Sequence, residues 1–83
     1  MHIRIYGPGC ARCHETERTV EDVVRESRSE ATLEKISGLM EISTSGILSV
    51  PAVTIDGEIM CQGSVPSRAE VLGWLDTKRR DKA

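Results

Sequence analysis

The sequence predicts an α/β fold with one four-stranded mixed sheet, helices on both faces and the element order β-α-β-α-β-β-α. Three observations support it. An alternating apolar segment opens the chain and stops at Gly-Pro-Gly, a helical periodicity follows, and an Asp-Gly pair lies between two apolar segments near residue 56. With 83 residues, the chain is expected to form one domain over residues 1–77, followed by a polar tail at 78–83.

The first half of the chain predicts two parallel strands joined by a right-handed helical crossover. Residues 2–6 alternate as a short strand, and residues 31–36 form the second strand. Between them, less polar residues recur at steps of three and four, which predicts a helix with one buried stripe. These residues are Cys13, Thr16, Val20, Val23, Val24 and Ser27. A short helix is then expected between Gly38 and Gly46, with the second glycine ending it in a left-handed conformation.

The Asp56-Gly57 pair predicts a two-residue hairpin between strands at 52–55 and 58–61. Such a turn places Ile55 opposite Glu58, and a regular ladder then places Ala52 opposite Cys61. The hairpin therefore adds two antiparallel strands to the sheet.

A last helix is expected from the segment Ser67-Arg68-Ala69-Glu70, which has the form of a capping box. The serine side chain caps an N–H of the first turn, and the glutamate side chain reaches back. The apolar residues that would supply the inner face of this helix are Val71, Leu72, Trp74 and Leu75.

Charge and hydropathy exclude several classes of partner. The net charge of -2 comes from 11 basic and 13 acidic residues that are mixed along the chain, so no field would gather nucleic acid or anionic lipid. No apolar segment approaches the length of a signal peptide core or a membrane span. We therefore expect a cytoplasmic monomer with no nucleic-acid or membrane partner.

The strongest chemical signal is Cys10-Ala11-Arg12-Cys13, which follows a strand and a glycine turn and opens a helix. One helical turn brings residues three apart onto one face, so the two sulfurs can form a disulfide. The free N–H groups and the helix dipole favour a thiolate at the first cysteine. Cys10 is therefore the predicted nucleophile and Cys13 the resolving thiol, with Arg12 and His14 tuning the pKa.

Two other chemistries fit the same cysteines. With His14, the motif matches the haem attachment pattern, but covalent haem needs a large apolar pocket and a second axial ligand in a chain that has only 2% aromatic residues. The second hypothesis is a metal or metalloid carrier or sensor, because paired thiolates bind Zn²⁺ or Cu(I). Cys61, His2 and His14 are the available further ligands, and Cys61 is otherwise a small buried apolar residue.

The Cys10–Cys13 motif together with Ser49-Val50-Pro51-Ala52-Val53 resembles the two signatures of the thioredoxin superfamily. The chain is similar to the small bacterial and archaeal thioredoxin-like proteins called redox-active disulfide proteins. The resemblance implies a thioredoxin/glutaredoxin-like fold that lacks the extra N-terminal strand and helix of full thioredoxins. It also implies that Pro51 is cis beside the cysteines and that Val50, Pro51 and Gly63 form a substrate groove.

The function implied is that of a disulfide oxidoreductase that reduces protein disulfides by dithiol exchange and needs no cofactor. Its partners would be disulfide-containing proteins and, for recharging, a flavoenzyme of thioredoxin-reductase type or another dithiol donor. The chain departs from thioredoxins in the dipeptide Ala11-Arg12, which replaces Gly-Pro between the cysteines, and at two further positions. Gly9 replaces the tryptophan before the first cysteine, and Arg4 replaces a buried aspartate.

Overall fold

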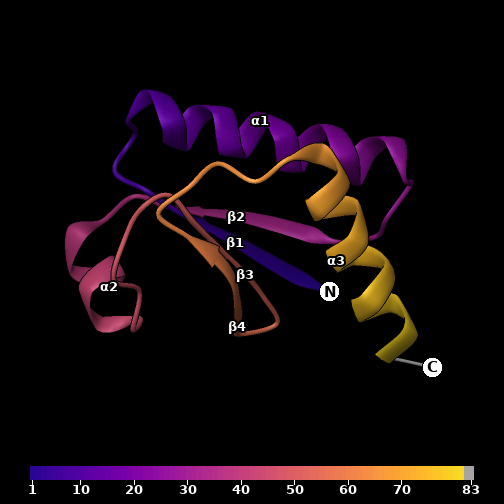
Figure 1. Cartoon of the computed structure of the whole chain (residues 1–83). Helices are drawn as coiled ribbons and strands as arrows, with labels where there is room; N and C mark the ends of the chain where they lie inside the picture. Colours follow the sequence, from indigo (N-terminus) through magenta and orange to yellow (C-terminus); the bar gives the residue numbers. More distant parts are fainter. Residues whose placement is uncertain (82–83) are drawn as a thin grey trace.

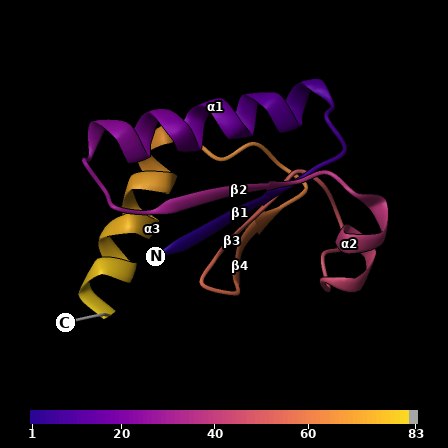
Figure 2. The ribbon, with the colours of Figure 1, turned by 180° about the vertical axis from the view of Figure 1, so that it is seen from behind.

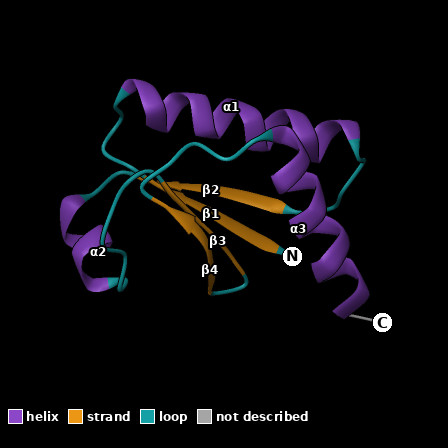
Figure 3. Cartoon of the chain, in the orientation of Figure 1, coloured by secondary structure: helices purple, strands orange, loops and turns teal. Residues whose placement is uncertain are grey.

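The computed structural model describes residues 1–81 and confirms the predicted α/β class and element order (Figures 1 and 3). The strands are β1 (His2–Tyr6), β2 (Thr32–Ile36), β3 (Ala52–Ile55) and β4 (Glu58–Gln62). The helices are α1 (Ala11–Glu26), α2 (Leu39–Thr44) and α3 (Arg68–Asp81). None of the helices within residues 1–81 has the length and apolar character needed to cross a membrane.

The four strands form one mixed sheet in the order β2-β1-β3-β4. Strand β1 pairs in parallel with β2 and antiparallel with β3, which pairs antiparallel with β4. Helices α1 and α3 lie together over one face, and α2 lies at the end of the sheet where β1 finishes (Figures 1 and 2). The start of α1 and the loop before β3 meet at that same end, which is therefore where a site can form.

The alternation of side chains along the strands divides the core into two clusters. The larger cluster lies between the sheet and helices α1 and α3. It contains Ile3, Ile5, Val20, Val23, Val24, Val53, Ile55, Val71 and Leu75. The smaller cluster lies on the opposite face, under α2. It contains Tyr6, Ile36, Ile42, Ile47 and Ala52.

The predicted buried stripe of α1 is confirmed for every residue except Ser27. Ser27 is half-buried and serves as the C-cap. At the other end, Cys10 is the N-cap, with extended φ and ψ of -71° and 168°. The stripe therefore fixes how α1 is rotated against the sheet, and this rotation sets the side of the helix on which each cysteine lies.

The hairpin forms at Asp56-Gly57, where both residues have positive φ values of 50° and 87°. Ile55 pairs with Glu58 as predicted, but the expected pairing of Ala52 with Cys61 is wrong. The register shifts between Val53 and Thr54, so Cys61 lies opposite Val53. A β-bulge inserts one residue into β4, and turn chemistry alone does not reveal it.

Helix α3 begins with the predicted capping box. The Ser67 Oγ accepts from the Glu70 N–H at 3.1 Å, and a Glu70 carboxylate oxygen accepts from the Ser67 N–H at 3.1 Å. Val71 and Leu75 are buried, but Leu72 is 45% exposed, so its predicted place on the inner face is wrong. The half-buried Trp74 packs against the core instead.

The polar segment expected as a tail from residue 78 is helical as far as Asp81, so the boundary expected at residue 77 lies inside α3. Residues 82 and 83 lie outside the described part of the chain.

Leu75 is buried and Leu72 is exposed, so shortening each side chain to alanine should lower the free energy of unfolding by different amounts. Leu75→Ala should lower the free energy of unfolding by about 2–5 kcal/mol, because it leaves a cavity between α3 and the sheet. Leu72→Ala is the matched control and should cost about 1 kcal/mol or less, because its side chain is partly in solvent. Urea unfolding midpoints measure both. Equal losses would contradict the orientation of α3.

Candidate active site

Cys10 lies exposed at the end of the loop that joins β1 to α1. The loop turns through Gly9, whose φ of 99° is in the region that favours glycine. As the N-cap residue, Cys10 accepts the N–H of Cys13 at its Sγ, at a distance of 3.4 Å. The sulfur of Cys10 is therefore accessible and lies at the positive end of α1.

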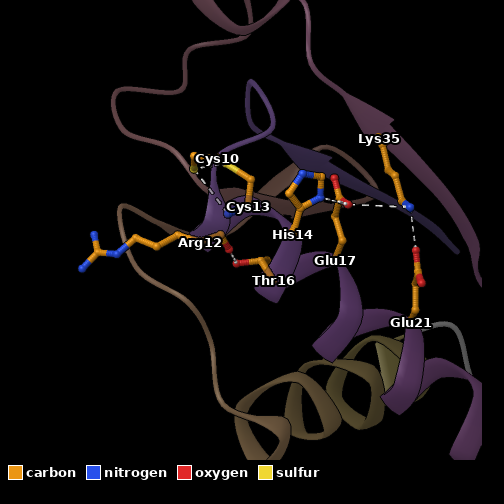
Figure 4. A network of polar contacts seen from close by, with 8 residues as sticks. All are labelled: Cys10, Arg12, Cys13, His14, Thr16, Glu17, Glu21 and Lys35. Carbon is orange, nitrogen blue, oxygen red and sulfur yellow. Dashed lines mark hydrogen bonds and ion pairs between the residues drawn. The ribbon is translucent and has the colours of Figure 1, made fainter.

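Cys13 lies one turn into α1 and is completely buried, with a relative exposure of 0%. Its Sγ lies 2.7 Å from the Sγ of Cys10, and both cysteines are thiols in this structure (Figure 4). The helical spacing thus brings one exposed and one buried sulfur into direct contact, as the sequence predicted.

The contact between the sulfurs, together with the burial of Cys13, moves the pKa values of the two cysteines in opposite directions. The pKa of Cys10 is lowered, chiefly by the hydrogen bond from the Cys13 side chain and then by the Cys13 backbone N–H. The Arg12 backbone N–H lowers it further. The pKa of Cys13 is raised, chiefly by burial and then by its side-chain hydrogen bond to Cys10. The exposed sulfur is thus the more acidic of the two, which is the order that a nucleophile and a resolving thiol require.

The side chains of Arg12 and His14 lie outside this sulfur contact. Figure 4 shows the Arg12 guanidinium extending away from both cysteines. The Nδ1 of His14 lies 3.4 Å from a carboxylate oxygen of Glu17, which also faces Lys35 of β2 at 3.7 Å. Lys35 in turn pairs with Glu21 at 2.8 Å. These ion pairs tie the exposed side of α1 to β2, and a tuning role for the Arg12 and His14 side chains stays a prediction.

The loop before β3 reaches the same end of the sheet. The Val50–Pro51 peptide bond is cis, the geometry that the family resemblance implies. Tyr6, the residue before Gly7, pairs with Ala52, the residue after Pro51. A Cβ on Gly7 would overlap Cys13, which means that Gly7 touches that cysteine directly. The pairing of β1 with β3 thus brings Pro51 to the same end of the sheet as Gly7 and the cysteine pair.

The three predicted groove residues differ in exposure. The Pro51 ring is fully buried, Val50 is half-buried and Gly63 is exposed. The N–H of Gly63 donates to the Pro51 carbonyl at 2.9 Å. Gly63 also has a φ of 81°, and a Cβ there would lie 3.1 Å from the Ser49 Cβ. Gly63 and Pro51 are therefore brought together, and Val50 is the partly exposed side chain beside them.

Two residues at this end were not singled out by the sequence patterns. Gly7 leaves space for the Cys13 side chain. A glycine between a strand and a helix that carries a cysteine indicates that the helix lies close to the backbone at that glycine. The Gln62 Oε1 accepts the Leu48 N–H at 2.9 Å and so holds the loop before Pro51. No sequence signal distinguishes Gln62 from other polar residues at a strand end.

Cys61 is half-buried against the main core, and burial raises its pKa. Within residues 1–81, no group of three or more His, Cys, Asp and Glu side chains is arranged to hold a metal ion. The structure thus does not bring Cys61, His2 or His14 together with the cysteine pair as a ligand set. Arg4 points to the opposite face of the sheet from Ile5 and pairs with Glu34 at 3.0 Å.

Removing the Cys13 thiol should raise the pKa of Cys10, because the Cys13 side chain is the largest cause of the lowered value. In a Cys61→Ala background, the ultraviolet absorbance of the thiolate should appear at higher pH in Cys13→Ala than in the parent. Arg12→Ala keeps its backbone N–H and should shift the titration less. A Cys13→Ala titration that coincides with the parent would contradict this assignment.

Comparisons with known proteins agree with this geometry. A family described as thioredoxin domain matches residues 1–76. The chain is 37% identical over 71 residues to a thioredoxin of Methanothermobacter thermautotrophicus, which covers 86% of this chain and 92% of the relative. It is 33% identical over 69 residues to a thioredoxin of Methanocaldococcus jannaschii, which covers 83% of this chain and 79% of the relative. Family and relatives support a thioredoxin-like thiol oxidoreductase, and the chain belongs to the thioredoxin family.

Proposed function

We propose that the protein reduces protein disulfides by dithiol exchange, with Cys10 as nucleophile and Cys13 as resolving thiol. The observation that carries the proposal is the contact between an exposed Sγ at the N-cap of α1 and a buried Sγ 2.7 Å away. Of the two sulfurs, only that of Cys10 is accessible to the disulfide of another protein, and that of Cys13 is placed to attack the Cys10 sulfur. The two thiols thus have the unequal access that the two steps need.

In the first step, the Cys10 thiolate attacks one sulfur of the substrate disulfide. A Cys10–substrate S–S bond forms, the substrate S–S bond breaks, and the departing sulfur leaves as a thiolate. The lowered pKa of Cys10 increases the fraction of reactive thiolate at a given pH. The rate of this step should therefore fall as the pH falls through the Cys10 pKa.

In the second step, Cys13 loses its proton and attacks the Cys10 sulfur. The Cys10–Cys13 bond forms, the mixed disulfide breaks, and the second substrate thiolate is released. The raised pKa of Cys13 keeps this thiol protonated until a base is close, and the thiolate released in the first step is a suitable proton acceptor. Two electrons pass to the substrate, and the protein is left oxidised.

The groove proposed for the substrate lies at the end of the sheet, next to the cysteines. Val50 would contact an extended substrate segment through its backbone and its half-exposed side chain. Pro51 is buried, so its role would be to shape the loop, and exposed Gly63 would leave room for the substrate backbone. The Arg12 and His14 side chains would act on the approaching substrate or on the thiolate from the exposed side of α1.

The partners proposed follow from the electron balance. Disulfide-containing proteins would be the oxidants, and the Cys10–Cys13 disulfide must then be reduced by a second two-electron donor. A flavoenzyme of thioredoxin-reductase type, or another dithiol protein, would supply these electrons. The exchange steps themselves use only the thiols of the two proteins.

The two cysteine variants should fail in different ways. Cys13→Ser keeps the exposed nucleophile and removes the resolving thiol, so it should accumulate mixed disulfides with a disulfide substrate that dithiothreitol dissolves. Cys10→Ser should accumulate almost none, because the remaining thiol of the pair is buried. Non-reducing gels after incubation with insulin provide the measurement.

Cys61→Ala is the matched control, since it removes the third thiol and leaves the pair intact. It should reduce insulin at the parent rate and should trap no substrate. Equal trapping by Cys13→Ser and Cys10→Ser would contradict the assigned roles. Trapping by neither variant, with no insulin reduction by the parent, would contradict the function itself.

A further inference from the structure

We infer that Gly7 is a positioning residue for the disulfide exchange, because only the absence of a side chain at this position lets the Cys13 sulfur lie against Cys10. A Cβ built on Gly7 would lie 2.8 Å from the Cys13 Cβ and closer still to its Sγ. Both separations are shorter than carbon or sulfur atoms tolerate without moving. The inference rests on the proposed function, because the position of Cys13 matters for exchange only if Cys13 resolves a mixed disulfide.

The requirement at Gly7 is for space and not for backbone conformation. Gly7 is not among the glycines with positive φ, so its backbone is open to any residue. Gly9, two residues later, has the opposite property. Its φ of 99° favours glycine, while a Cβ there would meet nothing within 4 Å. The two glycines of this loop therefore serve different ends, and only at Gly7 does the missing side chain leave space for a cysteine side chain.

Neither Gly7 nor Cys13 can move away from the other easily. Gly7 is buried, and its N–H donates to the Ile36 carbonyl at 2.9 Å, which continues the pairing of β1 with β2. The Cys13 Cβ belongs to α1, whose buried stripe is fixed in the main core by Val20 and Val23. Rotation about the Cys13 side chain would move the sulfur but would leave the two Cβ atoms overlapping. A side chain at position 7 must therefore displace the start of α1 or the end of β1.

Displacement of Cys13 would act on the second step of exchange. The Sγ atoms now lie 2.7 Å apart, and small misplacements of reacting atoms cost large factors in rate, on the order of 10²-fold for about 1 Å. At a pH above the Cys10 pKa, the loss of the Cys13 hydrogen bond leaves the fraction of Cys10 thiolate almost unchanged. The first step would then be affected less, because Cys10 is exposed and precedes the contact. Gly7→Ala should therefore slow the second step of exchange much more than the first.

The experiment uses Ellman's reagent, an aromatic disulfide, with the full chain in a Cys61→Ala background at a pH above the Cys10 pKa of both the parent and Gly7→Ala. Attack by Cys10 releases one aromatic thiolate, and attack by Cys13 on the mixed disulfide releases a second, so stopped-flow absorbance reports both steps. In Gly7→Ala, we expect the second phase to slow at least tenfold and the first phase to stay within about threefold of the parent. Gly73→Ala is the matched control, because a Cβ at this exposed site on α3 meets nothing within 4 Å. Both phases should be unchanged in that variant.

If Gly7→Ala folds poorly, its thermal stability can be measured in place of its kinetics. The loss of thermal midpoint caused by Gly7→Ala should be smaller in a Cys13→Gly background than in the parent, because the Cβ and the sulfur that the new Cβ meets are then both absent. Equal losses in the two backgrounds would overturn the inference, as would a folded Gly7→Ala variant with an unchanged second phase. A parent protein that shows no second phase at all would instead contradict the proposed function.

Discussion

The contact between the buried side of α1 and the end of β1 determines how this small domain presents its cysteines. Cys13 is fully buried because it shares a helical stripe with Val20 and Val23, and it fits against the sheet because Gly7 has no side chain. Cys10 is exposed because it precedes that stripe by one turn. The contacts that pack the core therefore also place the two sulfurs.

The opposite pKa shifts of the two thiols follow from this packing. Burial raises the pKa of Cys13, and the side-chain hydrogen bond between the two cysteines raises it further while lowering the pKa of Cys10. The helix N-terminus contributes backbone N–H groups on the same side. Two acidic side chains of α1, Glu17 and Glu21, instead pair with Lys35 of β2, away from the sulfurs. Backbone N–H groups, the contact between the sulfurs and the burial of one sulfur thus set the order of the two pKa values.

Local patterns were sufficient to predict the elements and the cysteine pair. The stripe of α1, the Asp56-Gly57 turn and the Ser67 capping box each depend on residues within a few positions of one another, and the structure contains all three. The β-bulge opposite Val53 and the exposure of Leu72 depend on how distant elements pack, which periodicity does not encode. From the sequence alone, Gly7 is predicted only to be part of the turn after β1. Its contact with Cys13 appears only when β1 and α1 are placed together.

The most direct test of the account is a redox titration of the unmodified protein in glutathione buffers, with mass spectrometry to locate the disulfide. The account predicts one two-electron transition, in which a disulfide joins Cys10 to Cys13 while Cys61 remains a thiol. A disulfide that includes Cys61, or a protein in which Cys10 and Cys13 never join, would contradict the claim that the start of α1 holds the redox centre.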